Sequence, residues 1–193
     1  MPRPAAEWIN ASGGVRGNTG FGLQYELRGG YKEVREPLFG FRPLDAGHVV
    51  EQLYMVDDHA WYARLLLAWK SERLDVDARG ELRTSRLDFS APAAEGLVGP
   101  ALFRGGCRAT YNWRRRVFAG ISLAGATGRE IRLQGQAGRL PGYVDLGLHA
   151  EYRIDSRWGV WLKGSNLLHQ QVYVSPVYRE IYPSLTLGGT FQL

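Results

Sequence analysis

Apolar and polar residues alternate along most of this sequence, and that pattern limits the fold more than any other feature. In the clearest stretch, a charged row interleaves with the apolar row 74–82; the charged row consists of Arg73, Asp75, Asp77, Arg79, Glu81 and Arg83. Successive side chains of a β-strand point to opposite faces, so this pattern predicts a strand with one charged and one apolar face. No segment shows a convincing helical period of 3.6 residues.

Seven further segments repeat the alternation, and a weaker first strand is expected over 9–15. None of the apolar rows contains Asp, Glu, Lys or Arg; they occupy alternate positions over 21–31, 61–69, 74–82, 103–111, 117–125, 144–152, 158–164 and 185–193. Charged residues gather instead in the intervening rows and in the connections. The sequence therefore predicts an all-β fold in which one face of the sheet is apolar throughout.

Alternation alone does not say which face meets water, so a soluble sandwich and a membrane barrel must be compared. The expected strands are about 10 to 13 residues long, close to the roughly 9–11 residues that cross a bilayer when tilted. Strands of soluble proteins usually have about 5–6 residues. The length of the strands favours an antiparallel, up-and-down transmembrane β-barrel whose apolar face contacts lipid.

The predicted connections also favour a barrel, because they alternate between short and long. Short turns are expected at 17–19, 71–72, 114–115 and 155–157, and long connections at 33–58, 86–100, 129–141 and 169–183. Outer-membrane barrels have short turns on the periplasmic rim and long loops outside. A sandwich has no reason to sort its loops in this way.

Large aromatic residues lie near the ends of the apolar rows, with smaller residues between them. Trp and Tyr prefer the two membrane interfaces because their rings combine an apolar body with a polar tip. We therefore expect interface positions for Phe21, Tyr31, Trp61, Trp69, Phe103, Tyr111, Tyr152 and Trp158. The alternative is that they are ordinary core aromatics. The charged row 73–83 is expected to face a wet lumen, where structural pairing is favoured over a specific ligand site.

Several other functions are disfavoured by the residues themselves. The longest uncharged apolar window, 117–128, has 12 residues and three glycines, too short for a membrane helix. One cysteine, Cys107, excludes a disulfide framework, and we expect no cofactor and no metal site. The net charge is +5, but the basic residues form no run longer than Arg114-Arg115-Arg116. Nucleic-acid binding is therefore not expected. Asp57-Asp58-His59 is the only acid–histidine cluster and is interpreted as a charged hairpin tip; no enzymatic activity is predicted.

The C-terminal quarter resembles a known family. The segment 142–153 leads into Val160-Trp161-Leu162-Lys163-Gly164-Ser165-Asn166-Leu167-Leu168, and after a loop comes Leu187-Gly188-Gly189-Thr190-Phe191. These segments are similar to the last three strands of TonB-dependent outer-membrane receptors, including the Asn-Leu-Leu that closes the penultimate strand. The order of strands and loops is similar back to about residue 37.

The final octet, 186–193, reads polar-x-Gly-x-x-hydrophobic-x-hydrophobic. It resembles the signal by which the barrel-assembly machinery recognises a terminal strand, carried here by Thr186, Gly188, Phe191 and Leu193. Phe is the commoner last residue, so Leu193 departs from the pattern. An ordinary last strand would give part of this pattern by its alternation.

The resemblance implies a bacterial (Gram-negative) outer-membrane barrel that takes part in transport of a bulky nutrient. The family's plug domain and TonB-contacting box are not visible in residues 1–193, nor is a signal peptide, so we expect the C-terminal portion of a receptor barrel. Nine spans are counted, with 48–56 as a weak tenth or else part of a long outer loop. The implied partners are outer-membrane lipid, the barrel-assembly machinery, and an upstream plug and barrel portion of the same receptor. The alternative is a plugless structural or adhesive barrel that binds a partner through its long outer loops.

Overall fold

The computed structural model describes residues 6–45, 48–87, 96–133, 135–173, 179–180 and 182–192. All its regular elements are β-strands. They are β1 (Ala6–Asn18), β2 (Leu23–Asp45), β3 (His48–Lys70), β4 (Leu74–Arg83), β5 (Phe103–Trp113), β6 (Val117–Ala126), β7 (Arg129–Leu133), β8 (Gln136–Leu140), β9 (Tyr143–Arg153), β10 (Trp158–Ser165), β11 (Val172–Tyr173), β12 (Arg179–Glu180) and β13 (Ser184–Phe191). In these residues there is no helix long and apolar enough to cross a membrane.

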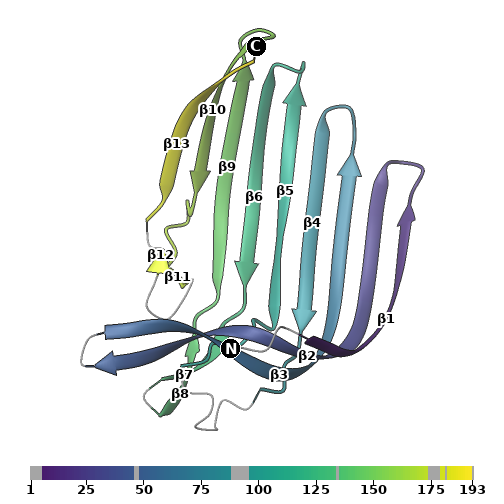
Figure 1. Cartoon of the computed structure of the whole chain (residues 1–193). Coiled ribbons are helices and arrows are strands. Elements are labelled where there is room, and N and C mark those ends of the chain that lie inside the picture. Colours follow the sequence, from purple (N-terminus) through teal and green to yellow (C-terminus); the bar gives the residue numbers. More distant parts are fainter. Residues whose placement is uncertain are drawn as a thin grey trace.

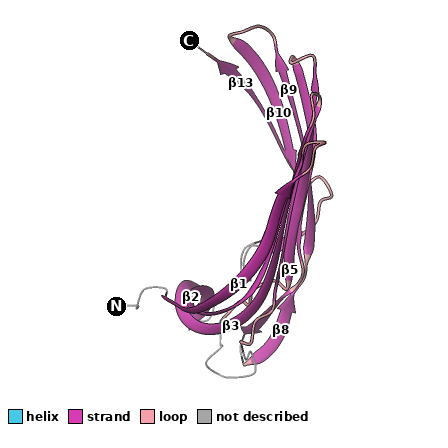
Figure 2. Cartoon of the chain, turned by 90° about the vertical axis from the view of Figure 1, so that its right-hand side faces the viewer, coloured by secondary structure: helices cyan, strands magenta, loops and turns pink. Residues whose placement is uncertain are grey.

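Nine of the strands form one antiparallel sheet in the order β1-β2-β3-β4-β5-β6-β9-β10-β13 (Figure 1). Each strand pairs with the strands before and after it in this series, which is the up-and-down topology predicted from the sequence. The sheet is strongly curved (Figure 2). Among the described residues β1 and β13 are its two edges, and no pairing joins them.

The register of the strand pairs places every predicted apolar row on the same face of this sheet. In one step across the sheet, Leu67 lies opposite Ala78, which lies opposite Cys107. Cys107 lies opposite Leu123, and Leu123 lies opposite Leu146. Directly opposed residues share a face, so the rows form one continuous apolar surface. We call it the apolar face, and the opposite surface the polar face.

In the part of the chain that the structure describes, neither face of the sheet is covered by a second layer. Among the described residues only Ala60, Leu97, Val98, Ile131 and Leu140 are buried hydrophobics. Val98, Ile131 and Leu140 pack together where the connection after β4 meets the β7–β8 hairpin. By contrast, large side chains of the apolar face remain exposed, among them Leu148 at 49% and Leu187 at 76%. The hydrophobic core of this chain therefore lies at one end, and the apolar face is unpartnered.

The connections are sorted between the two ends of the sheet. Turns of three or four residues join β1 to β2, β3 to β4, β5 to β6 and β9 to β10. The long connections at the other end carry the small hairpins β7–β8 and β11–β12. We call these the short-turn rim and the long-loop rim.

The prediction of a long connection over residues 33–58 is wrong. Residues 33–58 are not a loop, because β2 continues to Asp45 and β3 begins at His48, so the two strands stay paired throughout. The segment 48–56 is the first part of β3 and not a separate tenth strand. Figure 1 shows that this extension turns away from the direction of the other strands at the long-loop rim. Its poor alternation has a physical reason. The segment 48–56 pairs with β2 alone and extends past the ends of the other strands, where no continuous apolar face has to be maintained.

Candidate functional site: the polar face of the sheet

The charged row of β4 lies in the middle of the polar face. Asp75, Asp77, Arg79, Glu81 and Arg83 all share this face, and Arg73 precedes β4 in the turn. Their neighbours on β3 and β5 include four cations. Lys70 lies opposite Asp75, Arg108 lies opposite Asp77, and Glu81 lies between Arg64 and Arg104. Facing a wet lumen remains a prediction for this row. The structure nevertheless places its β4 members on one surface, with cations opposite the three carboxylates.

Glu81 connects three neighbouring strands. Its carboxylate accepts hydrogen bonds from Arg64 of β3, with Nε 2.9 Å from Oε2, and from Arg104 of β5, with Nη2 3.1 Å from Oε1. The carboxylate is largely covered, whereas the two arginines are exposed. Such charge-assisted bonds hold the strands in register. Exposure of both arginines keeps the expected contribution of each pair to about 1 kcal/mol or less.

A hollow of about 890 Å³ opens on the polar face next to this network. It crosses β1 to β6, and its charged lining residues are Arg16, Glu26, Asp77, Arg79 and Arg108. Small residues such as Gly106, Ser122 and Ala124 form its far wall and leave the space open. A mixed-charge, water-accessible surface of this kind is compatible with a polar solute passing along it.

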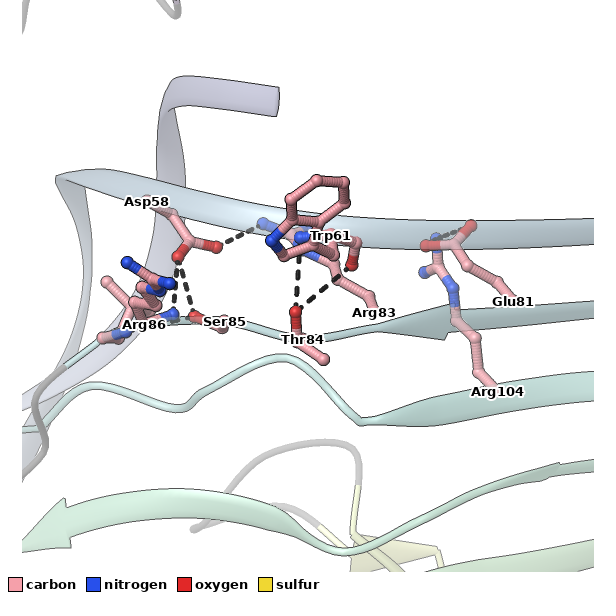
Figure 3. A network of polar contacts seen from close by, with 9 residues as sticks. Asp58, Trp61, Glu81, Arg83, Thr84, Ser85, Arg86 and Arg104 are labelled. Atoms are coloured by element: carbon pink, nitrogen blue, oxygen red, sulfur yellow. Dashed lines mark hydrogen bonds and ion pairs between the residues drawn. The ribbon is translucent and has the colours of Figure 1, made fainter. Parts of the chain in front are cut away.

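A second polar cluster lies at the long-loop rim and was not predicted as a unit (Figure 3). The Asp58 side chain is fully buried and accepts three hydrogen bonds: from Arg83 Nη2 at 2.7 Å, Ser85 Oγ at 2.8 Å and the Arg86 backbone N–H at 3.2 Å. Thr84 bonds to the backbone of Trp61 beside it. The cluster ties the start of the connection after β4 to β3 where the β2–β3 extension begins.

The acid–histidine cluster interpreted as a hairpin tip lies instead within β3, which is a correction. Asp58 and His59 are consecutive in a strand and so point to opposite faces. His59 Nδ1 lies 3.3 Å from Glu33 Oε1 and 3.2 Å from the Tyr31 hydroxyl. The two residues therefore belong to separate clusters, and Asp58 is not paired with His59.

The Asn-Leu-Leu motif has a structural role that its sequence did not reveal. Asn166 is 1% exposed and has a positive φ of 50°. Its side chain exchanges two hydrogen bonds with the backbone of Gln170, each 3.0 Å long, and its own N–H donates to Asp145 Oδ1 at 2.7 Å. Asn tolerates the left-handed region better than most residues, so this position suits the turn that ends β10.

The predicted interface aromatics lie at two levels of the sheet. Toward the short-turn rim are Phe21, Trp69, Tyr111, Tyr152 and Trp158, and toward the long-loop rim are Tyr31, Trp61 and Phe103. Trp61 and Trp158 are 59% and 53% exposed, which is unusual for core aromatics. Contact with the membrane interface remains a prediction, but the two-level arrangement it requires is present.

The predicted assembly signal lies on β13, an edge strand. Thr186 and Gly188 are on the polar face and Phe191 is on the apolar face opposite Trp158, while Leu193 lies outside the described residues. The Trp161 ring occupies the space that a Cβ on Gly188 would need, so close packing also requires a glycine at this position. Recognition by the assembly machinery remains a prediction.

No protein-family model matches the chain, and no curated protein matches it. Solved structures do match. They include the copper transporter OprC (TM-score 0.64, 14% identity, 93% of this chain and 30% of that one). They also include the ferric enterobactin receptor PfeA of Pseudomonas aeruginosa (TM-score 0.68, 12% identity, 94% and 30%) and the siderophore receptor PirA of Acinetobacter baumannii (TM-score 0.71, 9% identity, 94% and 31%).

The chain spans less than a third of the length of each of these proteins, and the identities are low. The likeness therefore concerns the fold. It agrees with the open, nine-stranded, up-and-down sheet and with the resemblance of the last three strands. The chain has the fold of a portion of the β-barrel of TonB-dependent outer-membrane receptors.

Proposed function

We propose that this chain forms part of the wall of an outer-membrane β-barrel that takes up a bulky nutrient. The observation that supports this most strongly is the continuous apolar face, which is formed by nine strands and covered by nothing in the described structure. Exposed apolar patches of this extent on a water-soluble monomer are rare and require a partner surface. Hydrocarbon is the partner that fits a sheet with strands of this length and with aromatics at two levels.

The two edge strands are the reason for proposing a larger barrel. In lipid, every backbone N–H and C=O needs a partner within the protein, and each unsatisfied group costs several kcal/mol. The outer edges of β1 and β13 require such partners. We propose that further strands of the same receptor, upstream in the sequence, close the barrel between them, as the coverage of about 30% of the similar receptors suggests.

The polar face then lines the lumen. Its mixed charges and its hollow of about 890 Å³ suit a path for a polar solute, and an upstream plug would gate that path. The similar structures are a copper transporter, a ferric enterobactin receptor and a siderophore receptor, so metal complexes are the first substrates to test. The barrel-assembly machinery is the proposed partner that inserts β13.

A second candidate, an adhesive barrel without transport, is favoured by the β2–β3 extension. Its two strands each have 23 residues, about twice the length of their neighbours, and they project from the long-loop rim. A paired hairpin of this length presents a surface outside the membrane.

Growth on a limiting nutrient separates the two candidates. We expect a strain that lacks the gene to grow poorly when chelated iron or copper is limiting, and removal of TonB to have the same effect. Complementation by a variant in which a two-residue turn replaces residues 36–56, so that the paired residues Arg35 and Asp57 flank the turn, should restore uptake if the hairpin serves adhesion only. Unchanged growth without the gene, together with loss of surface binding in that variant, would contradict the transport role.

A further inference from the structure

The turn between β5 and β6 has an unusual backbone for its sequence. Arg114 and Arg115 have φ values of 53° and 57°, and the Arg116 N–H closes the turn on the Trp113 carbonyl at 3.1 Å. Two consecutive residues with positive φ are normally Asn-Gly, because a Cβ is disfavoured in this region. In the described short turns these two are the only non-glycine residues with positive φ. Arginine is therefore retained here at a conformational cost.

The strained turn borders a cavity of about 510 Å³ at the short-turn rim. The cavity is lined by Glu72, Arg73, Asn112, Trp113, Arg114 and Arg115, so its lining includes three arginines and one carboxylate residue. Asn112 fixes the turn by accepting the Arg115 N–H at 2.8 Å on its side-chain oxygen. An excess of positive charge in a cavity of this size suits a phosphate-bearing group, which arginine binds through paired hydrogen bonds.

The position of Trp113 indicates where that phosphate group comes from. Trp113 follows Tyr111 on the apolar face, lies opposite Val117 and is 55% exposed. The Arg114 guanidinium lies 5.9 Å from the centre of its ring. The cavity therefore joins the lipid-facing surface to the basic turn, which is the level of lipid headgroups. An acidic protein segment in water would reach the arginines but would have no reason to contact Trp113.

The charge of the whole rim supports the same source. Residues 71–73, 114–116 and 154–157 contain five arginines and two carboxylates, so the rim as a unit attracts anions. Basic clusters next to a bilayer recognise anionic headgroups in this way. From this geometry we propose that the β5–β6 turn, with Arg73 and Trp113, is a binding site for an anionic phospholipid. The proposal rests on the membrane placement proposed above.

The test compares variants that keep the fold. Arg114→Asn with Arg115→Gly removes both charges and supplies the residues that this turn prefers, so it should fold at least as well. Arg114→Lys with Arg115→Lys keeps the charge. Lys70→Gln with Arg157→Gln is the matched control, because it removes two cations from the same rim outside the cavity.

Each variant is made in the whole receptor that contains this chain, the detergent-solubilised protein is offered equimolar phosphatidylglycerol and phosphatidylcholine, and native mass spectrometry measures which lipid it retains. A cation near an anionic lipid surface contributes about a fivefold preference, so two contribute about 25-fold. We expect the Asn-Gly variant to lose most of the preference for phosphatidylglycerol. The Lys variant and the rim control should keep most of theirs, and glycerol phosphate should not displace the lipid.

Three results would overturn the site. An equal loss in the rim control would mean that general rim charge is responsible. Displacement by glycerol phosphate would mean that a free anion binds and Trp113 contributes nothing. Retention of the preference by the Asn-Gly variant would exclude the turn as the lipid-binding site. Its arginines would then be candidates for contact with an acidic protein. Insertion of the whole receptor that contains this chain into phosphatidylcholine vesicles is measured in parallel: a receptor that inserts but shows no lipid preference loses only this site, whereas one that does not insert loses the proposed function too.

Discussion

Two adjacent residues in the middle of β6 allow the two faces to be compared at one depth. Leu123 is on the apolar face, opposite Cys107 and Leu146. Ala124 is on the polar face, opposite Gly106 and Asp145, and borders the polar hollow. We expect Leu123→Arg to destabilise the protein in a bilayer much more than Ala124→Arg does.

The size of the difference follows from the depth. The midpoint of β6 is 1.5 residues from Leu123, which at a rise of about 3.3 Å and a tilt of about 40° places Leu123 about 4 Å from the midplane. Arginine on the lipid face costs about 2–4 kcal/mol at the midplane and less near the interface. We therefore expect a loss of about 2–3 kcal/mol in the free energy of unfolding for Leu123→Arg. Attraction to Asp145 keeps the change for Ala124→Arg within about 1 kcal/mol.

Both substitutions are made in the whole receptor that contains this chain, and urea unfolding in phosphatidylcholine vesicles, followed by tryptophan fluorescence, measures their effect. The midpoints are converted to free energies with the slope of the unmodified receptor. Equal losses for the two substitutions would refute the assignment of the faces. A larger loss for Ala124→Arg would reverse it.

The remaining predictions concern the two rims. Asp58→Ala should lower the free energy of unfolding by about 3–5 kcal/mol, since it removes a fully buried carboxylate that accepts three hydrogen bonds, one of them from a guanidinium. Arg104→Ala at an exposed pair should cost less than about 1 kcal/mol, and similar losses in urea would contradict this. Two backbone N–H groups that donate to its carboxylate hold the pKa of Asp155 below its usual value. The contribution of Asp155 to folding stability is therefore present above the pKa of the unfolded state and is lost as the pH falls through the pKa of the folded state. The stability advantage over D155N should therefore shrink on acidification below about pH 4, and a gap that does not change with pH would exclude this role. Arg114→Asn with Arg115→Gly should raise the free energy of unfolding by about 1 kcal/mol, and a loss of stability would show that the turn is not strained.

Local alternation was sufficient to predict the faces of the strands. The row that contains Cys107 and the row that contains Leu123 were expected to be apolar separately, and the register then placed them side by side. This works because a shift of one residue would move a whole apolar row to the charged face. Register is therefore specified wherever the two faces differ.

Interactions between distant segments could not be predicted in the same way. The partner of Asp58 is Arg83, 25 residues away, and nothing local in either segment specifies that pair. The same holds for Asn166 and Asp145. The β2–β3 extension was missed because paired strands outside the main sheet need no alternation. Two positive φ values at Arg114 and Arg115 had no sequence signal, since arginine is not a residue that this turn normally uses.

The central claim is that the apolar face contacts lipid and the polar face contacts water, and the one cysteine of the chain tests it directly. Cys107 is exposed on the apolar face of β5, and Arg108 follows it on the polar face. In vesicles, a charged maleimide that does not cross or enter the bilayer should fail to label Cys107 until the protein is unfolded in urea. The same reagent should label Cys107→Ala with Arg108→Cys readily. Rapid labelling of Cys107 in the folded protein, at the rate of the cysteine at position 108, would contradict the claim.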